Sequence, residues 1–224
     1  TARSRGLGDV YKRQEDNFEI LKKQLIKEIQ KSNNIDLTEM LIWLFMQQDE
    51  FSAAYVYCKA IDKRLNENGH RMYELASIAH ENKVYKVAID AYEYLIKKDN
   101  PNYLLEAKIL KVIAQSEQIL TSTYAKYDLE KIDDEYQNTI NELGKNISTA
   151  YLIKEYAHFQ GFYLNNLEKA VSLLEECISI TISEKELQAN CKLELADILL
   201  MQGDPWEAIL PVSYTHLTLP TIRE

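Results

Sequence analysis

Histidine is the residue type best suited to bind a metal ion or to exchange protons near neutral pH. Three of the four histidines, His70, His80 and His158, lie between residues 15 and 210. Helical metal sites place two histidines four residues apart, so that both side chains reach one ion from the same face. His70 and His80 are ten residues apart, and His158 is far from both. The spacing therefore predicts surface or groove histidines and no metal site.

The densest acidic run consists of Asp133, Asp134 and Glu135. Neighbouring residues on a helix point in different directions, so three consecutive carboxylates do not converge on one cation. We interpret the run as solvated charge.

Thiol chemistry is also not indicated. Cys58, Cys177 and Cys191 form no close pair in the sequence, which favours small buried hydrophobic side chains over a disulfide framework or a zinc site. Residues 15–210 contain no Gly-rich phosphate loop, nucleophile elbow or paired-carboxylate motif. We expect no catalytic residue, no metal and no cofactor, and we expect that the chain is not an enzyme.

The elements that carry these residues follow an internal repeat of 34 residues. Residues 36–69 and 70–101 align without a gap, and each copy reads as a helix, a tight turn and a second helix. The aligned pairs are Leu41 with Leu75, Phe51 with Tyr85, Ala54 with Ala88, Tyr55 with Ile89, Cys58 with Tyr92 and Ile61 with Leu95. The period predicts an all-α solenoid of helix pairs.

Helical periodicity continues on both sides of these two copies. We expect a lone helix over 15–31 and units at about 36–69, 70–101, 102–144, 148–181 and 184–210, the last of them truncated. Asp36 is the predicted N-cap of the first complete unit, and Gly69 is predicted to adopt a left-handed conformation at the end of that unit.

The two ends match nothing in this pattern. Residues 9–14 can be encoded by a short DNA word whose reverse complement, read one frame over, encodes residues 212–216. The word resembles the transposon end used as an adaptor in sequencing libraries. We expect residues 1–14 and 211–224 to be translated adaptor, and residues 15–210 to be an internal fragment of a longer protein.

The charge balance excludes one class of partner. The chain has 26 Lys and Arg against 35 Asp and Glu, a formal net charge of −9. Five of the basic and two of the acidic residues lie in the two ends, so residues 15–210 carry −12. Nucleic-acid binding draws its affinity from Lys and Arg, so we expect no nucleic-acid partner. No apolar run reaches the ~18 residues that a membrane span needs.

With its small residues at Ala54 and Ala88, the aromatic residues three positions earlier and Pro101 at a repeat end, the chain resembles the tetratricopeptide repeat (TPR) family. The Trp and Gly that the family has in its first helix are replaced here by Thr38 and Ile42, then Met72 and Ala76. The Lys-, Asn-, Ile- and Tyr-rich composition suggests an AT-rich bacterial genome. The chain looks most like long TPR proteins of Bacteroidota-type bacteria, and a cytoplasmic or a periplasmic location is left open.

The resemblance implies a right-handed superhelix of about four to five units with a concave groove lined by the leading helices. The family's groove positions fall on Glu39, Trp43, Met46, Gln47, Tyr73, Ser77, His80, Glu81, Glu155, Phe159, Phe162, Tyr163, Asn190, Asp197 and Met201. Aromatic side chains among them, such as Trp43 and Tyr73, are suited to anchor a bound peptide, although each could instead pack against a neighbouring unit.

These features predict a non-catalytic scaffold that binds a peptide or protein in the groove. The clamp with which some family members hold a chaperone's C-terminal carboxylate is excluded, because its Lys and Asn positions are Glu39 and Trp43 here. Two alternatives stay open: an accessory or regulatory region of a larger enzyme or signalling protein, and a peptide-sensing module. Severed repeats at both ends predict exposed apolar surface and self-association.

Overall fold

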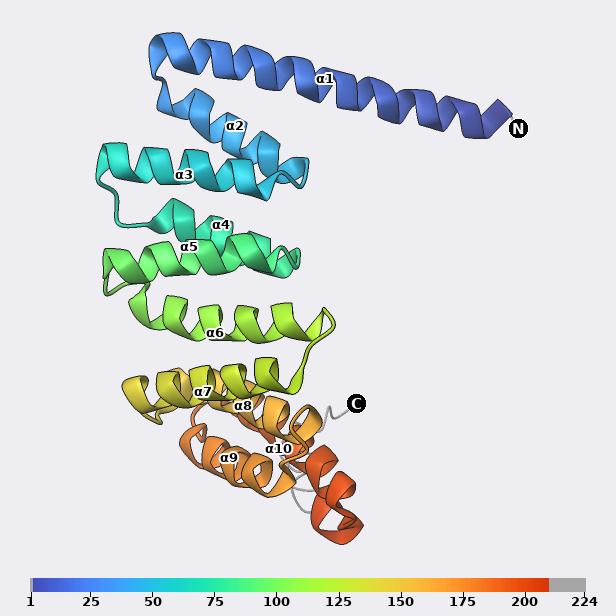
Figure 1. The fold of residues 1–224 in the computed structure, drawn as a ribbon, viewed down its shortest axis with the longest axis vertical. Helices are drawn as coiled ribbons and strands as arrows, with labels where there is room; N and C mark the ends of the chain where they lie inside the picture. The colour runs from blue at the N-terminus through green and yellow to red at the C-terminus, as the bar shows by residue number, and fades with distance from the viewer. Residues whose placement is uncertain (1, 210–224) are drawn as a thin grey trace, which may run out of the picture. The chain divides into compact units, whose positions relative to one another are not determined.

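The computed structural model describes the backbone of residues 2–209 and the side chains of residues 17–209 (Figure 1). The described backbone is helical and contains no strand, which confirms the all-α prediction. The helices are α1 (Ala2–Ser32), α2 (Ile35–Gln47), α3 (Phe51–Leu65), α4 (His70–Glu81), α5 (Tyr85–Lys98), α6 (Leu104–Leu120), α7 (Lys126–Leu143), the 3-10 helix η1 (Ile147–Thr149), α8 (Ala150–Phe162), α9 (Leu167–Ile180) and α10 (Lys185–Gln202). Residues 205–209 are also helical.

The chain forms two compact units, Thr1–Ala107 and Lys108–Glu224. In the first unit, α2 packs on α3 and α4 packs on α5 as helix-turn-helix pairs, with α1 against α2. In the second unit, α8 contacts α7, α9 and α10. Residues 211–224, predicted to be adaptor, lie outside the described residues.

The two pairs of the first unit close with the same turn. Asp49 and Lys83 both adopt the left-handed conformation, with φ of 56° and 60°. The next N–H in each turn donates to a carbonyl five residues earlier and so satisfies a free group at the helix end. These bonds are Glu50 to Phe45 and Val84 to Ala79, both 2.8 Å. Identical turns 34 residues apart confirm the predicted repeat.

Small residues pack where the helices of a pair cross. Ala54 and Ala88 are completely buried, as is Ala170 in α9. A larger side chain at these positions would push the paired helices apart. Gly161 has the same role between α8 and α10, because a Cβ there would overlap the Cδ1 atom of Ile198.

Some helix ends differ from the prediction. The lone helix expected over 15–31 begins earlier, since α1 spans Ala2–Ser32. The N-cap of α2 is Asn34, whose side chain accepts hydrogen bonds from the backbone N–H groups of Asp36 and Leu37 at 2.8 and 3.4 Å. The prediction of Asp36 was therefore wrong by two residues. Gly69 is left-handed as predicted, with φ of 95°, but it begins α4, while the left-handed Asn66 ends α3.

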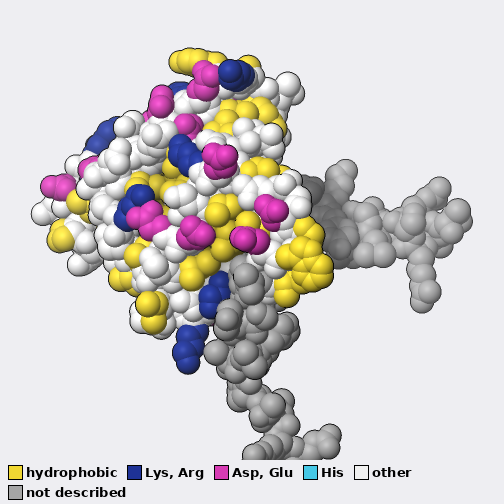
Figure 2. Space-filling model, turned by 90° about the horizontal axis from the view of Figure 1, so that it is seen from below, with side chains coloured by type: hydrophobic (Ala, Val, Ile, Leu, Met, Phe, Trp, Pro, Cys, Tyr) yellow, Lys and Arg dark blue, Asp and Glu magenta, His cyan; other side chains and the backbone are white. Residues whose placement is uncertain are grey.

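Buried hydrophobic side chains form the core of each unit, and others reach the surface. On the face shown in Figure 2, exposed hydrophobic side chains lie between Asp and Glu side chains. The most exposed large hydrophobic residue among those described is Trp206, at 82%. It follows α10, whose Leu200 and Met201 are also exposed.

Candidate functional site

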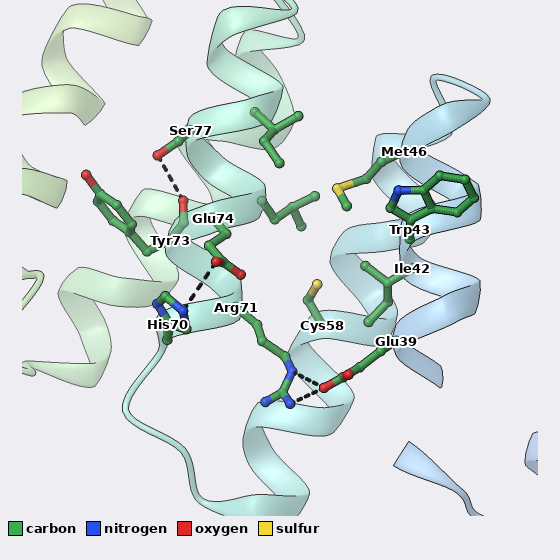
Figure 3. A pocket seen from close by; sticks show the side chains of 12 residues that line it. Glu39, Ile42, Trp43, Met46, Cys58, His70, Arg71, Tyr73, Glu74 and Ser77 are labelled. Atoms are coloured by element: carbon green, nitrogen blue, oxygen red, sulfur yellow. Dashed lines mark hydrogen bonds and ion pairs between the residues drawn. The ribbon is translucent and has the colours of Figure 1, made fainter. Parts of the chain in front are cut away.

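The first unit contains a cavity of about 690 Å³ between the leading helices α2 and α4, with one residue of α3 (Figure 3). We name it the α2–α4 cavity. Its lining residues are Glu39, Ile42, Trp43, Met46, Cys58, His70, Arg71, Tyr73, Glu74, Leu75, Ser77 and Ile78. A peptide side chain or a short peptide segment fits such a volume.

Helix periodicity explains why these side chains face the cavity. α2 buries Leu41, Leu44 and Phe45 against its neighbours, which leaves Glu39 and Trp43, one turn apart, on the other side. α4 buries Met72, Leu75, Ala76 and Ala79 in the same way. Its residues Tyr73 and Ser77 are also one turn apart, and the Ser77 hydroxyl donates to the Tyr73 carbonyl at 3.1 Å.

Arg71 links the two sides of the cavity. Its Nε donates to Glu39 Oε1 at 3.0 Å (Figure 3). Another guanidinium nitrogen pairs with Glu67. The hydrogen bond to Glu67, and then the one to Glu39, raise the pKa of Arg71 against the opposing effect of burial. Glu74 pairs with His70, and the distance from His70 Nε2 to Glu74 Oε1 is 3.2 Å. The three carboxylates Glu39, Glu67 and Glu74 therefore carry more negative charge than the guanidinium of Arg71 offsets.

Tyr73 is positioned by an aromatic neighbour. Its ring stacks on Tyr103 with centroids 5.1 Å apart, and the Tyr103 hydroxyl lies 3.2 Å from His70 Nδ1. Burial, followed by the hydrogen bond to Glu106, raises the pKa of Tyr73 to about 12. Tyr73 is therefore a neutral, pre-oriented side chain at the edge of the cavity.

The structure brings five of the predicted groove residues of the first unit to one cavity: Glu39, Trp43, Met46, Tyr73 and Ser77. Gln47 is exposed at the end of α2 and does not line the cavity. His80 lies at the other end of α4, where its Nδ1 is 3.4 Å from the Tyr92 hydroxyl.

Some of the predicted groove residues of the second unit line a cavity, and others do not. Asn190 and Asp197 of α10 line a smaller cavity of about 250 Å³ together with His158 and Phe162 of α8. Tyr163 lies at the end of α8, partly exposed.

Two other predicted residues of α8 are engaged within the unit. Glu155 pairs with Lys154 at 2.9 Å. Phe159 is only 1% exposed, because its ring packs between Tyr136 and Tyr163. Phe159 is therefore a core residue in this structure, the alternative that its spacing left open.

A polar cluster beside the smaller cavity was missed by the sequence analysis. His158 Nδ1 lies 2.8 Å from Glu194 Oε1, and Lys154 Nζ lies 3.2 Å from Glu194 Oε2. Burial works against ionisation of Glu194, but the hydrogen bond with His158 and the charge of Lys154 hold its pKa below the ordinary value. The residues are 36 and 40 positions apart, and no local pattern connects them.

Asp133 was predicted to be a solvated surface charge, but in the structure it is bonded to side chains of the second unit. Its carboxylate accepts a hydrogen bond from the Tyr156 hydroxyl at 2.6 Å and another from Gln160, and Lys169 Nζ is 3.4 Å away. Asp134, its neighbour, is exposed as predicted. Asp133 ties α7 to α8 and α9.

The cysteines are buried, as predicted, and Cys177 Sγ lies 3.0 Å from Cys191 Sγ. This proximity was not visible in the sequence. Within residues 17–209, no three His, Cys, Asp or Glu side chains are placed to hold a metal ion. None of the helices described is both long and apolar enough to cross a membrane.

Neither protein-family models nor curated proteins give a match to this chain. Solved structures do. BtubC from P. vanneervenii is 12% identical, with 95% of each chain covered and a TM-score of 0.58. TTC0263, a TPR protein of Thermus thermophilus, is 15% identical, with 82% of this chain and 90% of that chain covered and a TM-score of 0.56. YrrB, described as a TPR protein with an unusual peptide-binding site, is 11% identical, with coverages of 88% and 93% and a TM-score of 0.52.

Proposed function

We propose that this chain, which has the fold of TPR proteins, is a non-catalytic scaffold that binds a segment of a partner protein in the α2–α4 cavity. The observation that carries the proposal is Trp43, which lines the cavity although 54% of its surface is exposed. Large aromatic side chains that border a cavity are typical anchor points for a protein partner.

Three further observations support the proposal. The cavity is lined from two leading helices, so a bound segment contacts both repeats at once. Ile42, Met46 and Ile78 supply apolar surface, while Glu39, Tyr73 and Ser77 supply polar groups that orient a backbone or side chain. The solved structure of YrrB, which has the same fold, is described as containing a peptide-binding site.

The test starts from a random library of 12-residue peptides displayed on phage and selected on the immobilised chain. Synthetic versions of the enriched peptides are then titrated by fluorescence anisotropy. Trp43→Ala should weaken binding about 10-fold or more, the loss expected for a central aromatic contact. Val56→Ala is the matched control, because Val56 is exposed on α3 and does not line the cavity.

Two results would contradict the proposal. One is the absence of any enriched peptide. The other is enrichment of peptides whose binding is the same for Trp43→Ala as for the unchanged chain.

A further inference from the structure

Charge is divided unevenly between the leading and the trailing helices of the first unit. The leading helices α2 and α4 carry Asp36, Glu39, Glu74 and Glu81 against one Arg, Arg71, no Lys and two histidines, His70 and His80. The trailing helices α3 and α5 have the opposite excess, with Lys59, Lys63, Arg64, Lys86, Lys97 and Lys98 against Asp62, Asp90 and Glu93. The leading helices are the ones that line the α2–α4 cavity, so the potential there is negative.

Arg71 does not make the cavity a site for anions. Its guanidinium already serves two carboxylates, Glu39 and Glu67. A carboxylate or phosphate of a partner would have to displace one of them. It would also face Glu74, whose side chain is 58% exposed. Both effects act against an acidic ligand.

The same geometry favours a cation. Trp43 offers an exposed aromatic face, and aromatic faces attract ammonium and guanidinium groups. Glu39 is one turn from Trp43 on α2, and Glu74 projects into the same cavity from α4 (Figure 3). Met46 and Ile42 lie beside Trp43 and supply apolar contact for a neighbouring side chain.

We propose that the α2–α4 cavity selects a partner segment in which a lysine or arginine stands next to an apolar residue. This inference rests on the groove function proposed above and names the chemistry of its partner. The cation would contact Trp43 and pair with Glu74, and the apolar side chain would pack against Met46 and Ile42.

The test uses the composition of the peptides that the phage library yields on the whole chain. Those whose binding depends on Trp43 should be enriched in Lys and Arg next to Leu, Ile, Met or Phe, and depleted in Asp and Glu. Their synthetic, N-acetylated and C-amidated forms should bind more weakly when each Lys or Arg is replaced by Gln.

A pair of variants locates the effect. Glu74→Gln should weaken binding of the selected peptides about 3- to 5-fold, as expected for a partly exposed ion pair. Glu93→Gln removes the same charge from α5, outside the cavity, and should leave binding unchanged.

The outcomes separate the two proposals. Enriched peptides that depend on Trp43 but are neutral or acidic, or that bind equally well to Glu74→Gln, would overturn the selection of cations and leave the groove function standing. If no peptide depends on Trp43, both are overturned.

Discussion

At the scale of single residues, Cys58 combines a place in the wall of the α2–α4 cavity with almost complete burial. Burial raises the pKa of its thiol to about 12. Because the thiolate is the reactive form, alkylation by iodoacetamide at pH 8 should be about 1,000-fold slower in the folded chain than in urea. Peptide mapping by mass spectrometry measures both rates. Equal rates in the two states would contradict this burial.

Glu194 gives a prediction about pH. Its folded-state pKa lies below the ordinary value of 4.5, so the unfolded state takes up the proton first as the pH falls. The stabilisation is therefore present above about pH 4.5 and is lost as the pH falls through the lower folded-state pKa. Glu194→Gln should flatten the free energy of unfolding against pH in that acidic range, measured by urea denaturation.

The matched control for Glu194 is Glu186→Gln. Glu186 lies on the same helix but is exposed. It should leave the acidic limb of the stability profile unchanged. A profile for Glu194→Gln that parallels the unchanged chain would show that the contacts with His158 and Lys154 do not form.

At the scale of helices, Gly161 sets how closely α8 approaches α10. Alanine is the better helix former by about 1 kcal/mol, but its Cβ would overlap Cδ1 of the fully buried Ile198. We expect Gly161→Ala to destabilise the chain by about 1–2 kcal/mol, because overpacking outweighs propensity. Thermal and urea unfolding measure the difference.

Ile198→Val tests the cause, since valine lacks only the Cδ1 atom. In the Ile198→Val background, Gly161→Ala should leave the free energy of unfolding unchanged or increase it. A double-mutant cycle gives the coupling free energy between positions 161 and 198. If the cost is the same in both backgrounds, the helices are not in contact at this point.

The helices themselves were largely predictable from the sequence. The apolar pattern of the second unit predicts its leading helix at about 70–81, which agrees with α4 at both ends. The pattern is bounded by Gly69 on one side and by the turn at Lys83 on the other. The N-cap of α2 was less predictable. Asn34 and Asp36 are both good capping residues, and the choice depends on where the left-handed Asn33 ends α1.

The candidate site was predictable only where a helix has one buried face. Glu39, Trp43, Tyr73 and Ser77 lie on helices with a clear exposed side, so positions transferred from the family reached the cavity. α8 is packed against three other helices and is buried on most of its surface. Position along such a helix does not reveal which side chains reach the surface, and the burial of Phe159 follows from that.

At the scale of the whole molecule, exposed apolar side chains predict self-association. Trp206, Leu200 and Ile209 are exposed near the end of the described residues, and Ile20 is exposed on α1. Such surface favours contact with a second copy. Light scattering coupled to sizing should give a mass that rises above that of one chain with concentration. Trp206→Ser should reduce the rise.

Tyr127→Ser is the control for Trp206→Ser, because Tyr127 is also highly exposed but lies on α7. It should leave the concentration dependence as it is. A single-chain mass at every concentration for the unchanged protein would refute the prediction of self-association.

The ion pairs between neighbouring repeats have a mechanical consequence. Arg71 joins Glu39 across the leading helices, and Lys98 joins the fully buried Asp62 across the trailing helices. The two residues of each pair are more than thirty positions apart in the sequence, so each ion pair connects two adjacent repeats directly. Bending that separates the leading helices stretches the Arg71–Glu39 pair, and bending that separates the trailing helices stretches the Lys98–Asp62 pair. Salt screens the more exposed Arg71–Glu39 pair and has little effect on the Lys98–Asp62 pair, whose carboxylate is buried. Raising the ionic strength should therefore lower the resistance of this unit to bending that separates the leading helices more than its resistance to bending that separates the trailing helices.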